Sequence, residues 1–159
     1  MEGTDRVRDF INQNGLEIGV KVFADASTHT SESAAKALRC TPAQIAKTIA
    51  FTADYGSIKK PVLVVLSGDK LVDIEKLKSA TGSNDIKKMN ASEVEALTGY
   101  VIGGVPPFPH DKDVEVVIDK SLFRFELVWA AAGDKNAVMP IDPKLLVEKL
   151  GLREVAVSK

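Results

Sequence analysis

The stretch Pro61-Val62-Leu63-Val64-Val65-Leu66 contains no charged or hydroxyl side chain. A continuous apolar run of this length, rich in valine and leucine, is typical of a central β-strand that is covered on both faces. Upstream of it, Thr48-Ile49-Ala50-Phe51-Thr52 is predicted to be a second strand, and Asp54-Tyr55-Gly56-Ser57 has the composition of a turn. We therefore expect the core to lie on a sheet with other elements packed on its two faces.

Strands and short helices alternate along the rest of the chain, without an internal repeat, a low-complexity tract or a linker. Further strands are predicted at residues 20–23, 114–118, 127–130 and 137–140. Helices are predicted at residues 5–14, from Thr30 or Ser31 through Leu38, from the Thr41-Pro42-Ala43-Gln44 capping-box pattern up to Lys47, at 72–80, from Asn90 to Gly99, and from Asp142 to Gly151. Because these elements do not follow a regular βαβ alternation, they favour a mixed α/β sheet over a Rossmann domain.

The composition is that of an ordinary globular domain. With 159 residues, 45% of them hydrophobic and 27% charged, the chain is expected to form one domain over residues 1–159. No apolar stretch approaches the roughly 20 residues that span a bilayer, and the polar, acidic start of the chain does not resemble a signal peptide. We therefore expect a cytoplasmic protein with no membrane partner.

The net charge and the few cysteine and histidine residues argue against two further classes, proteins with a large nucleic-acid surface and proteins with a metal or disulfide site. The net charge of −1 argues against a large sequence-independent nucleic-acid surface, although it allows a grip on a single-stranded RNA end. Cys40 is the only cysteine, and His29 and His110 lack the spacing of metal ligands. We therefore expect no disulfide, metal or cofactor. Cys40 itself is either a nucleophile or, more commonly at a helix end, a small packing residue.

The most distinctive segment is Tyr100-Val101-Ile102-Gly103-Gly104-Val105-Pro106-Pro107-Phe108-Pro109-His110. A glycine pair allows close backbone approach and positive φ, and the prolines that follow stiffen the chain. Such a loop can present fixed N–H groups to a carbonyl or a phosphate. Its composition is equally that of a rigid structural turn, and His110 could lie in a pocket or on the surface.

Lys47 is the second candidate, in Gln44-Ile45-Ala46-Lys47-Thr48-Ile49. A lysine at the end of a strand can engage an anionic group, but many lysines beside strands are simply solvated edge residues. The hydroxyls of Thr28, Thr30, Ser31 and Thr48 are candidates for the same site, or for caps and turns. Asp134 lies between two predicted strands, where turn chemistry alone explains it. No Gly-x-Ser-x-Gly motif is present.

Five blocks in this order resemble the YbaK/ProX family. They are Thr30-Ser31-Glu32-Ser33-Ala34-Ala35, Ile45-Ala46-Lys47-Thr48, Ser67-Gly68-Asp69, Thr98-Gly99-Tyr100-Val101-Ile102-Gly103-Gly104-Val105-Pro106-Pro107, and Ala131-Ala132-Gly133-Asp134. The family includes the editing domain of bacterial-type prolyl-tRNA synthetases and its free-standing relatives. The resemblance implies a mixed β-sheet or barrel surrounded by short helices, and hydrolysis of the ester of mischarged tRNA. Because the chain contains no synthetase core, it implies deacylation in trans.

The resemblance also assigns residues and partners. It places the catalytic site at Lys47, Gly103 and Gly104, and substrate-binding positions at Thr30, Thr48, Val105, Pro106, Pro107, His110, Gly133 and Asp134. The implied partners are the 3′ end of a mischarged tRNA and an aminoacyl-tRNA synthetase such as prolyl-tRNA synthetase. The chain departs from the family pattern at Pro109, where glycine is usual, and at Ala24-Asp25, where several members carry histidine and other polar residues.

Two alternatives remain at this point. The chain could be a non-catalytic module that binds the tRNA 3′ end or an aminoacyl-adenylate. It could also be a structural interaction protein in which the segment Gly103–Pro107, called the glycine loop below, is only a turn. The chemistry favours the deacylase. An aminoacyl ester is already activated, so its hydrolysis requires positioning, an oriented water and oxyanion stabilisation more than a strong nucleophile.

Overall fold

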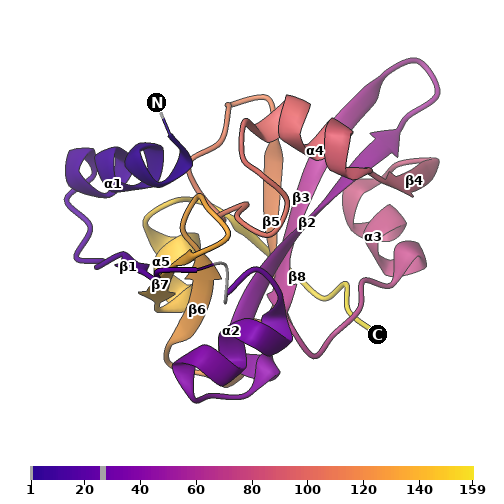
Figure 1. The fold of residues 1–159 in the computed structure, drawn as a ribbon. Helices are drawn as coiled ribbons and strands as arrows, with labels where there is room; N and C mark the ends of the chain where they lie inside the picture. The colour runs from indigo at the N-terminus through magenta and orange to yellow at the C-terminus, as the bar shows by residue number, and fades with distance from the viewer. Residues whose placement is uncertain (1, 26–27) are drawn as a thin grey trace.

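The computed structural model describes residues 2–25 and 28–159 (Figure 1). Within these residues the strands form one eight-stranded mixed sheet. The strand order is β1 (Lys21–Val22), β7 (Ala137–Ile141), β6 (Val128–Ala131), β2 (Ile45–Asp54), β3 (Lys59–Ser67), β5 (Glu115–Asp119) and β8 (Arg153–Val155), and β4 (Asp85–Lys88) pairs with β2. Five α-helices accompany the sheet: α1 (Gly3–Gln13), α2 (Ser31–Leu38), α3 (Ile74–Thr81), α4 (Ala91–Thr98) and α5 (Pro143–Glu148). The prediction of a mixed α/β fold is confirmed.

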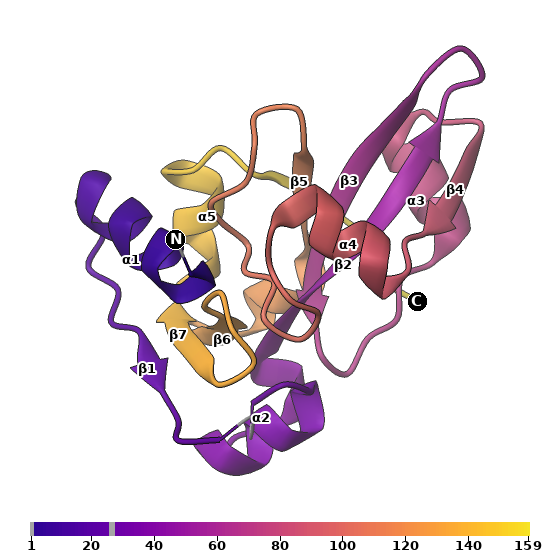
Figure 2. The ribbon, with the colours of Figure 1, turned by 45° about the horizontal axis from the view of Figure 1, so that its top comes forward.

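The two strands predicted first form the centre of the sheet. β2 and β3 pair antiparallel from Ala46 opposite Ser67 to Asp54 opposite Lys59. Alternation along β3 sends Leu63 and Val65 into a core cluster that also contains Val94 of α4, while Val64 enters a second cluster with Leu77 of α3. Figure 2 shows α3 and α4 on opposite sides of this hairpin. The central strand is therefore covered on both faces, as its apolar sequence predicts.

The helix caps form largely where the sequence places them. Thr30 caps α2, with its Oγ1 accepting a 3.0 Å hydrogen bond from the Ser33 N–H. Asn90 and Glu93 form a reciprocal capping box at the start of α4, and Gly99 ends that helix with φ at 75°. These local hydrogen bonds satisfy backbone groups that a helix end leaves without partners. The caps therefore fix the ends of these helices, and with them the points at which the chain enters the sheet.

The segment before Lys47 differs from the prediction. Residues Pro42–Gln44 form only a 3-10 turn (η1), and the Thr41 side chain makes no capping hydrogen bond. The strand β2 begins already at Ile45, because Ile45 pairs with Trp129 of the parallel strand β6. Lys47 is therefore the third residue of a strand rather than a residue that precedes one.

Three short elements and two helix ends were also missed. The strands β4 and β8 and the 3-10 helix η2 (Lys120–Arg124) carry too few buried side chains to show a period; in β4 only Ile86 is buried. The helix predicted from residue 72 begins at Ile74, and the last helix ends at Glu148, before Gly151. Among the described helices, none combines the length and the apolar character that crossing a membrane requires.

Candidate active site

A cavity of about 250 Å³ lies where the start of β2 meets β6, β7 and two loops, residues 28–31 and 101–105. Five of the predicted site residues line it together: Thr30, Lys47, Thr48, Gly103 and Val105. Further polar groups come from Thr28 and Ser31, and an apolar wall is built by Ala34, Ile45, Trp129, Ala131 and Val138. Residues separated by more than 70 positions in the sequence thus form one small chamber that is lined by both polar and apolar side chains.

Lys47 is the one cationic residue among the described residues that line this chamber, His29 aside. Its backbone is fixed by the pairing of β2 with Leu66 of β3. Burial lowers the pKa of Lys47 below its ordinary value of 10.5, and the nearby charge of Lys88 lowers it further, while Glu32 and Asp69 raise it. Within the described residues no carboxylate lies within ion-pair distance of its Nζ. A half-buried cation without an ion-pair partner is suited to bind an anionic group of a ligand.

Thr48, the next residue of β2, carries a hydroxyl without a hydrogen-bond partner. Its Oγ1 is buried and makes no hydrogen bond in the described structure. The other threonine hydroxyls in the wall are already engaged: Thr28 donates to the Lys135 carbonyl at 2.7 Å, and Thr30 caps α2. Because neighbouring residues of a strand point to opposite faces of the sheet and this Oγ1 is buried, the hydroxyl does not share the open side of the cavity with the Lys47 side chain.

Gly103 requires glycine for two reasons. Its φ is +86°, and a Cβ atom there would lie 2.9 Å from the carbonyl oxygen of His29. The loop around it therefore packs directly on the 28–31 segment. Within the described residues the N–H groups of Gly103 and Val105 donate no hydrogen bond, so both remain available to a ligand carbonyl or phosphate oxygen.

Gly104 lies behind this surface, with Gly133 and Asp134. The Gly104 N–H donates to the Val101 carbonyl at 2.9 Å, and its carbonyl accepts from Gly133 at 3.0 Å. A Cβ at Gly104 would lie 2.7 Å from the Asp134 backbone. Asp134 accepts from the Lys135 N–H at 2.8 Å, which is the turn chemistry that the sequence allows. These three residues are placed to hold the two loops together rather than among the residues that line the cavity.

Pro106, Pro107 and His110 also lie outside the cavity wall. Pro107 and His110 line a second cavity of about 500 Å³, together with Phe10 and Phe108. Since a carbonyl can only accept, His110 donates its Nε2–H to the Pro106 carbonyl at 2.7 Å. This hydrogen bond holds the end of the glycine loop on the side away from the first cavity.

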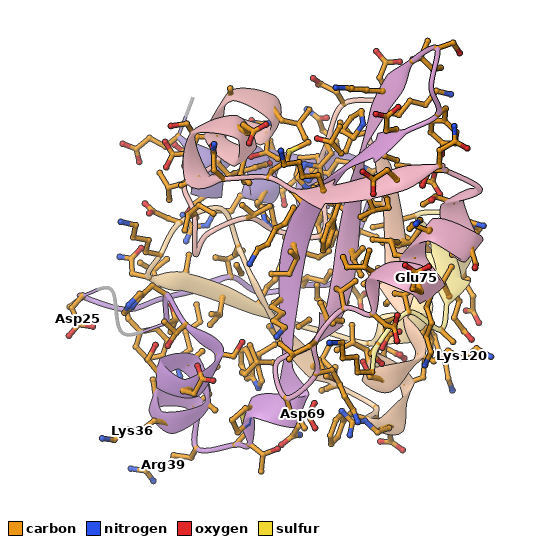
Figure 3. The ribbon with its side chains drawn as sticks, turned by 90° about the vertical axis from the view of Figure 1, so that its right-hand side faces the viewer. Asp25, Lys36, Arg39, Asp69, Glu75 and Lys120 are labelled. Carbon is orange, nitrogen blue, oxygen red and sulfur yellow. The ribbon has the colours of Figure 1, made fainter. Side chains whose placement is uncertain are left out.

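The segment in which this chain departs from the YbaK/ProX pattern, Ala24-Asp25, is not among the residues that line the cavity either. Both residues are exposed, and Figure 3 shows Asp25 pointing away from the body of the protein. Ala26 and Ser27, which follow, lie outside the described residues. At the second departure, the Pro109 carbonyl accepts a 3.1 Å hydrogen bond from the Tyr100 hydroxyl.

The protonation of His110 leads to a prediction about stability. Burial lowers the pKa of His110 below its ordinary value of 6.5, and its Nδ1 is buried without a partner. The unfolded chain therefore binds the proton first as the pH falls, so stability is full above 6.5 and decreases below it. We expect the melting temperature of the wild type to fall between pH 7 and pH 5 more steeply than that of His110→Gln. A parallel pH dependence in the two proteins would contradict this, and His29→Gln is the matched control.

No pattern in the sequence indicated the apolar wall of the cavity. Trp129 and Ala131 share one side of β6, but that strand is only four residues long, too short to reveal which side faces a site. Ile45 and Val138 are ordinary core residues by type. Their role depends on the closure of the sheet against α2, which is a tertiary arrangement.

Comparison with known proteins agrees with this geometry. Residues 25–149 match the family described as "Aminoacyl-tRNA editing domain". The uncharacterized protein YwhH of Bacillus subtilis is 34% identical over 89% of this chain and 87% of its own length. The multifunctional Ser/Thr-tRNA deacylase ProXp-y of Escherichia coli is 31% identical over 60% of this chain and 59% of its own length.

Among solved structures, a candidate trans-editing enzyme for prolyl tRNA synthetase superposes with a TM-score of 0.86 at 28% identity, covering 100% of this chain and 98% of the other. The matched residues 25–149 contain α2, the glycine loop and every residue that lines the cavity. The chain belongs to the aminoacyl-tRNA editing domain family.

Proposed function

We propose that this chain is an aminoacyl-tRNA deacylase, which hydrolyses the ester bond of mischarged tRNA in trans. The observation that carries the proposal is the cavity itself, which joins Lys47 and two backbone N–H groups of the glycine loop that donate no hydrogen bond within the described residues. The family membership and the deacylase and trans-editing names of its relatives support the same activity.

The cavity would hold the 3′ end of the tRNA. Lys47 would bind the phosphate of the terminal adenosine, because a compact ammonium is a good partner for a phosphate oxygen. This contact would fix the ester relative to the protein, which replaces a costly encounter by a positioned reaction.

The glycine loop would stabilise the transition state. Attack of water on the ester carbon places negative charge on the carbonyl oxygen, and the N–H groups of Gly103 and Val105 are available to receive it. As in family members without a protein nucleophile, the neighbouring hydroxyl of the terminal ribose would assist the water. The only cysteine, Cys40, does not line the cavity, and burial raises the pKa of its thiol, so it is not an activated nucleophile.

The proposal takes residues 1–159 as a single domain. The segments outside the matched residues 25–149 are part of the same core: Val7 and Ile11 of α1 pack in one cluster and Val155 and Val157 in the other. The buried Asp119 carboxylate also accepts hydrogen bonds from the Val157 N–H at 2.8 Å and the Ser158 N–H at 3.2 Å. The net charge of −1 is consistent with a partner synthetase that supplies part of the tRNA affinity.

The experiment is a time course of amino-acid release from an aminoacylated tRNA, with the protein at one hundredth of the RNA concentration. A deacylase releases many amino acids per protein molecule. A module that only binds the 3′ end would instead protect the ester from spontaneous hydrolysis, in proportion to the protein added.

Metal chelation tests whether deacylation proceeds without a metal ion. The described residues contain no group of three or more His, Cys, Asp or Glu side chains that could hold a metal ion. We therefore expect EDTA to leave the rate of deacylation unchanged, and zinc addition to have no effect. The measurement uses an aminoacylated RNA minihelix, whose folding does not depend on divalent ions as much as that of a whole tRNA. A rate that falls with EDTA and returns with one metal would contradict the mechanism.

A further inference from the structure

The apolar residues that line the cavity are alanine, valine and isoleucine with one exception. Ala34, Ala131 and Val138 leave space, whereas Trp129 contributes the largest side chain in the wall. It is also the only tryptophan of the chain. The cavity measures about 250 Å³, which is below the roughly 300–1,000 Å³ of common small-molecule sites. The position of one indole therefore decides a large share of the available space.

Trp129 is held rigidly in this position. Its strand β6 pairs with β2 on one side, with Trp129 opposite Ile45, and with β7 on the other, with Trp129 opposite Pro140. The indole packs against a small cluster formed by Ala34, Ala35 and Ile45. The paired strands fix the backbone of Trp129, and the packing of the indole on this cluster opposes its movement away from the cavity.

The remaining wall determines the class of group that fits. The proposed function assigns Lys47 to the phosphate. The apolar residues of the lining are left for the aminoacyl side chain, and none of the described residues that line the cavity carries a carboxylate to pair with a cationic side chain. The space beside Trp129 thus suits a small uncharged side chain.

We infer that Trp129 is the specificity-determining residue of this chain, and that it sets the upper size limit of the aminoacyl side chain that the cavity admits. The inference rests on the proposed function for the identity of the ligand. It assigns alanine-, serine- and threonine-sized groups as substrates and leucine- and phenylalanine-sized groups as excluded. One methylene in a fitted pocket discriminates by about 10–200-fold, so a rigid indole is sufficient for this selection.

The first test is a deacylation panel on one tRNA charged in turn with alanine, serine, threonine, leucine or phenylalanine. In Trp129→Ala we expect the rate for leucine relative to alanine to rise about 10-fold or more, and in Trp129→Phe to rise less. Leu127→Ala is the matched control, because Leu127 is a 54% exposed apolar residue just before the same strand and does not line the cavity. An unchanged size profile in a folded Trp129→Ala protein would overturn the inference.

A second variant keeps the test decisive if Trp129→Ala does not fold. Ala131→Leu narrows the same cavity from the same side of β6, and should reduce the rate for threonine more than the rate for alanine. Equal reduction for the two amino acids would contradict a size limit at this wall.

Fluorescence separates the inference from the proposed function. Since Trp129 is the only tryptophan, indole emission of the wild type reports on the cavity directly. We expect 3′-deoxy-3′-(alanylamino)adenosine, which cannot be hydrolysed as an ester, to change the emission on titration, and the leucyl analogue to change it only at about 10-fold higher concentration or more. If no aminoacyl ester is hydrolysed but this size-dependent response remains, the deacylase proposal fails and the size limit stands. An equal response to both analogues, or none to either, would overturn the size limit even if hydrolysis is observed.

Discussion

Replacement of Lys47 by methionine is expected to lower the deacylation rate by on the order of 10²–10³, which is the usual effect of removing one preorganised electrostatic contact. The same change should leave the melting temperature unchanged or raise it. The pKa of Lys47 is lowered by burial, so the charged form is less stable in the folded chain than in the unfolded chain. Methionine keeps most of the apolar stem and removes that cost. The rate and the melting curve are to be measured on one preparation.

Two further variants complete this test. Lys36→Met removes one positive charge from α2, and Figure 3 shows Lys36 pointing into solvent at the end of that helix. Its rate should match the wild type, which separates a local contact from a general effect of net charge. Lys47→Arg should recover only part of the activity, because a planar guanidinium does not replace a compact ammonium. Full activity in a folded Lys47→Met protein would remove Lys47 from the site.

Gly103→Ala is expected to reduce the rate by a similar amount, about 10²–10³. The alanine would have to adopt a φ of +86°, and its Cβ would lie 2.9 Å from the His29 carbonyl oxygen, so the loop must move away from the 28–31 segment. That movement displaces the N–H groups of Gly103 and Val105 from the place of the developing oxyanion. We expect kcat to fall more than KM rises, because the contact is made in the transition state.

Gly82→Ala is the matched control for this effect. Gly82 ends α3 with φ at +70°, and no atom lies within 4 Å of the Cβ that alanine would add. It carries the same conformational strain, on the order of 1 kcal/mol, without touching the cavity. Its melting temperature should fall while its specific activity remains. If Gly103→Ala behaves in the same way, the glycine loop is only a turn, and the assignment of its N–H groups is wrong.

Gly104 illustrates what the sequence alone leaves open at the site. A glycine pair predicts that other backbone segments approach closely, but the sequence does not indicate which segment lies against which of the two glycines. Gly103 approaches the loop of His29 at the cavity, whereas Gly104 approaches the backbone of Asp134 behind it. Both loops are distant in sequence, so only the folded arrangement assigns the two roles. The melting temperature of Gly104→Ala should therefore fall together with its activity.

The fold was more accessible than the site because its signals are local. The apolar run Val62–Leu66 and the caps at Thr30 and Asn90 act within a few residues, and the structure confirms each of them. The predicted start of β2 was wrong. The strand begins at Ile45 because Ile45 pairs with Trp129, which lies more than 80 residues away in the sequence. His110 could not be placed for the same reason, since its neighbours include Phe10 at the other end of the chain.

The most direct measurement of the central claim is turnover on a panel in which several amino acids are each attached to several tRNAs, with the protein far below the RNA concentration. The account predicts repeated release of a small uncharged amino acid from at least one tRNA on which it is misplaced, while the correctly charged tRNA is spared and Lys47→Met is inactive. Release of no amino acid from any tRNA, with the ester protected in proportion to bound protein, would contradict it and identify a binding module instead.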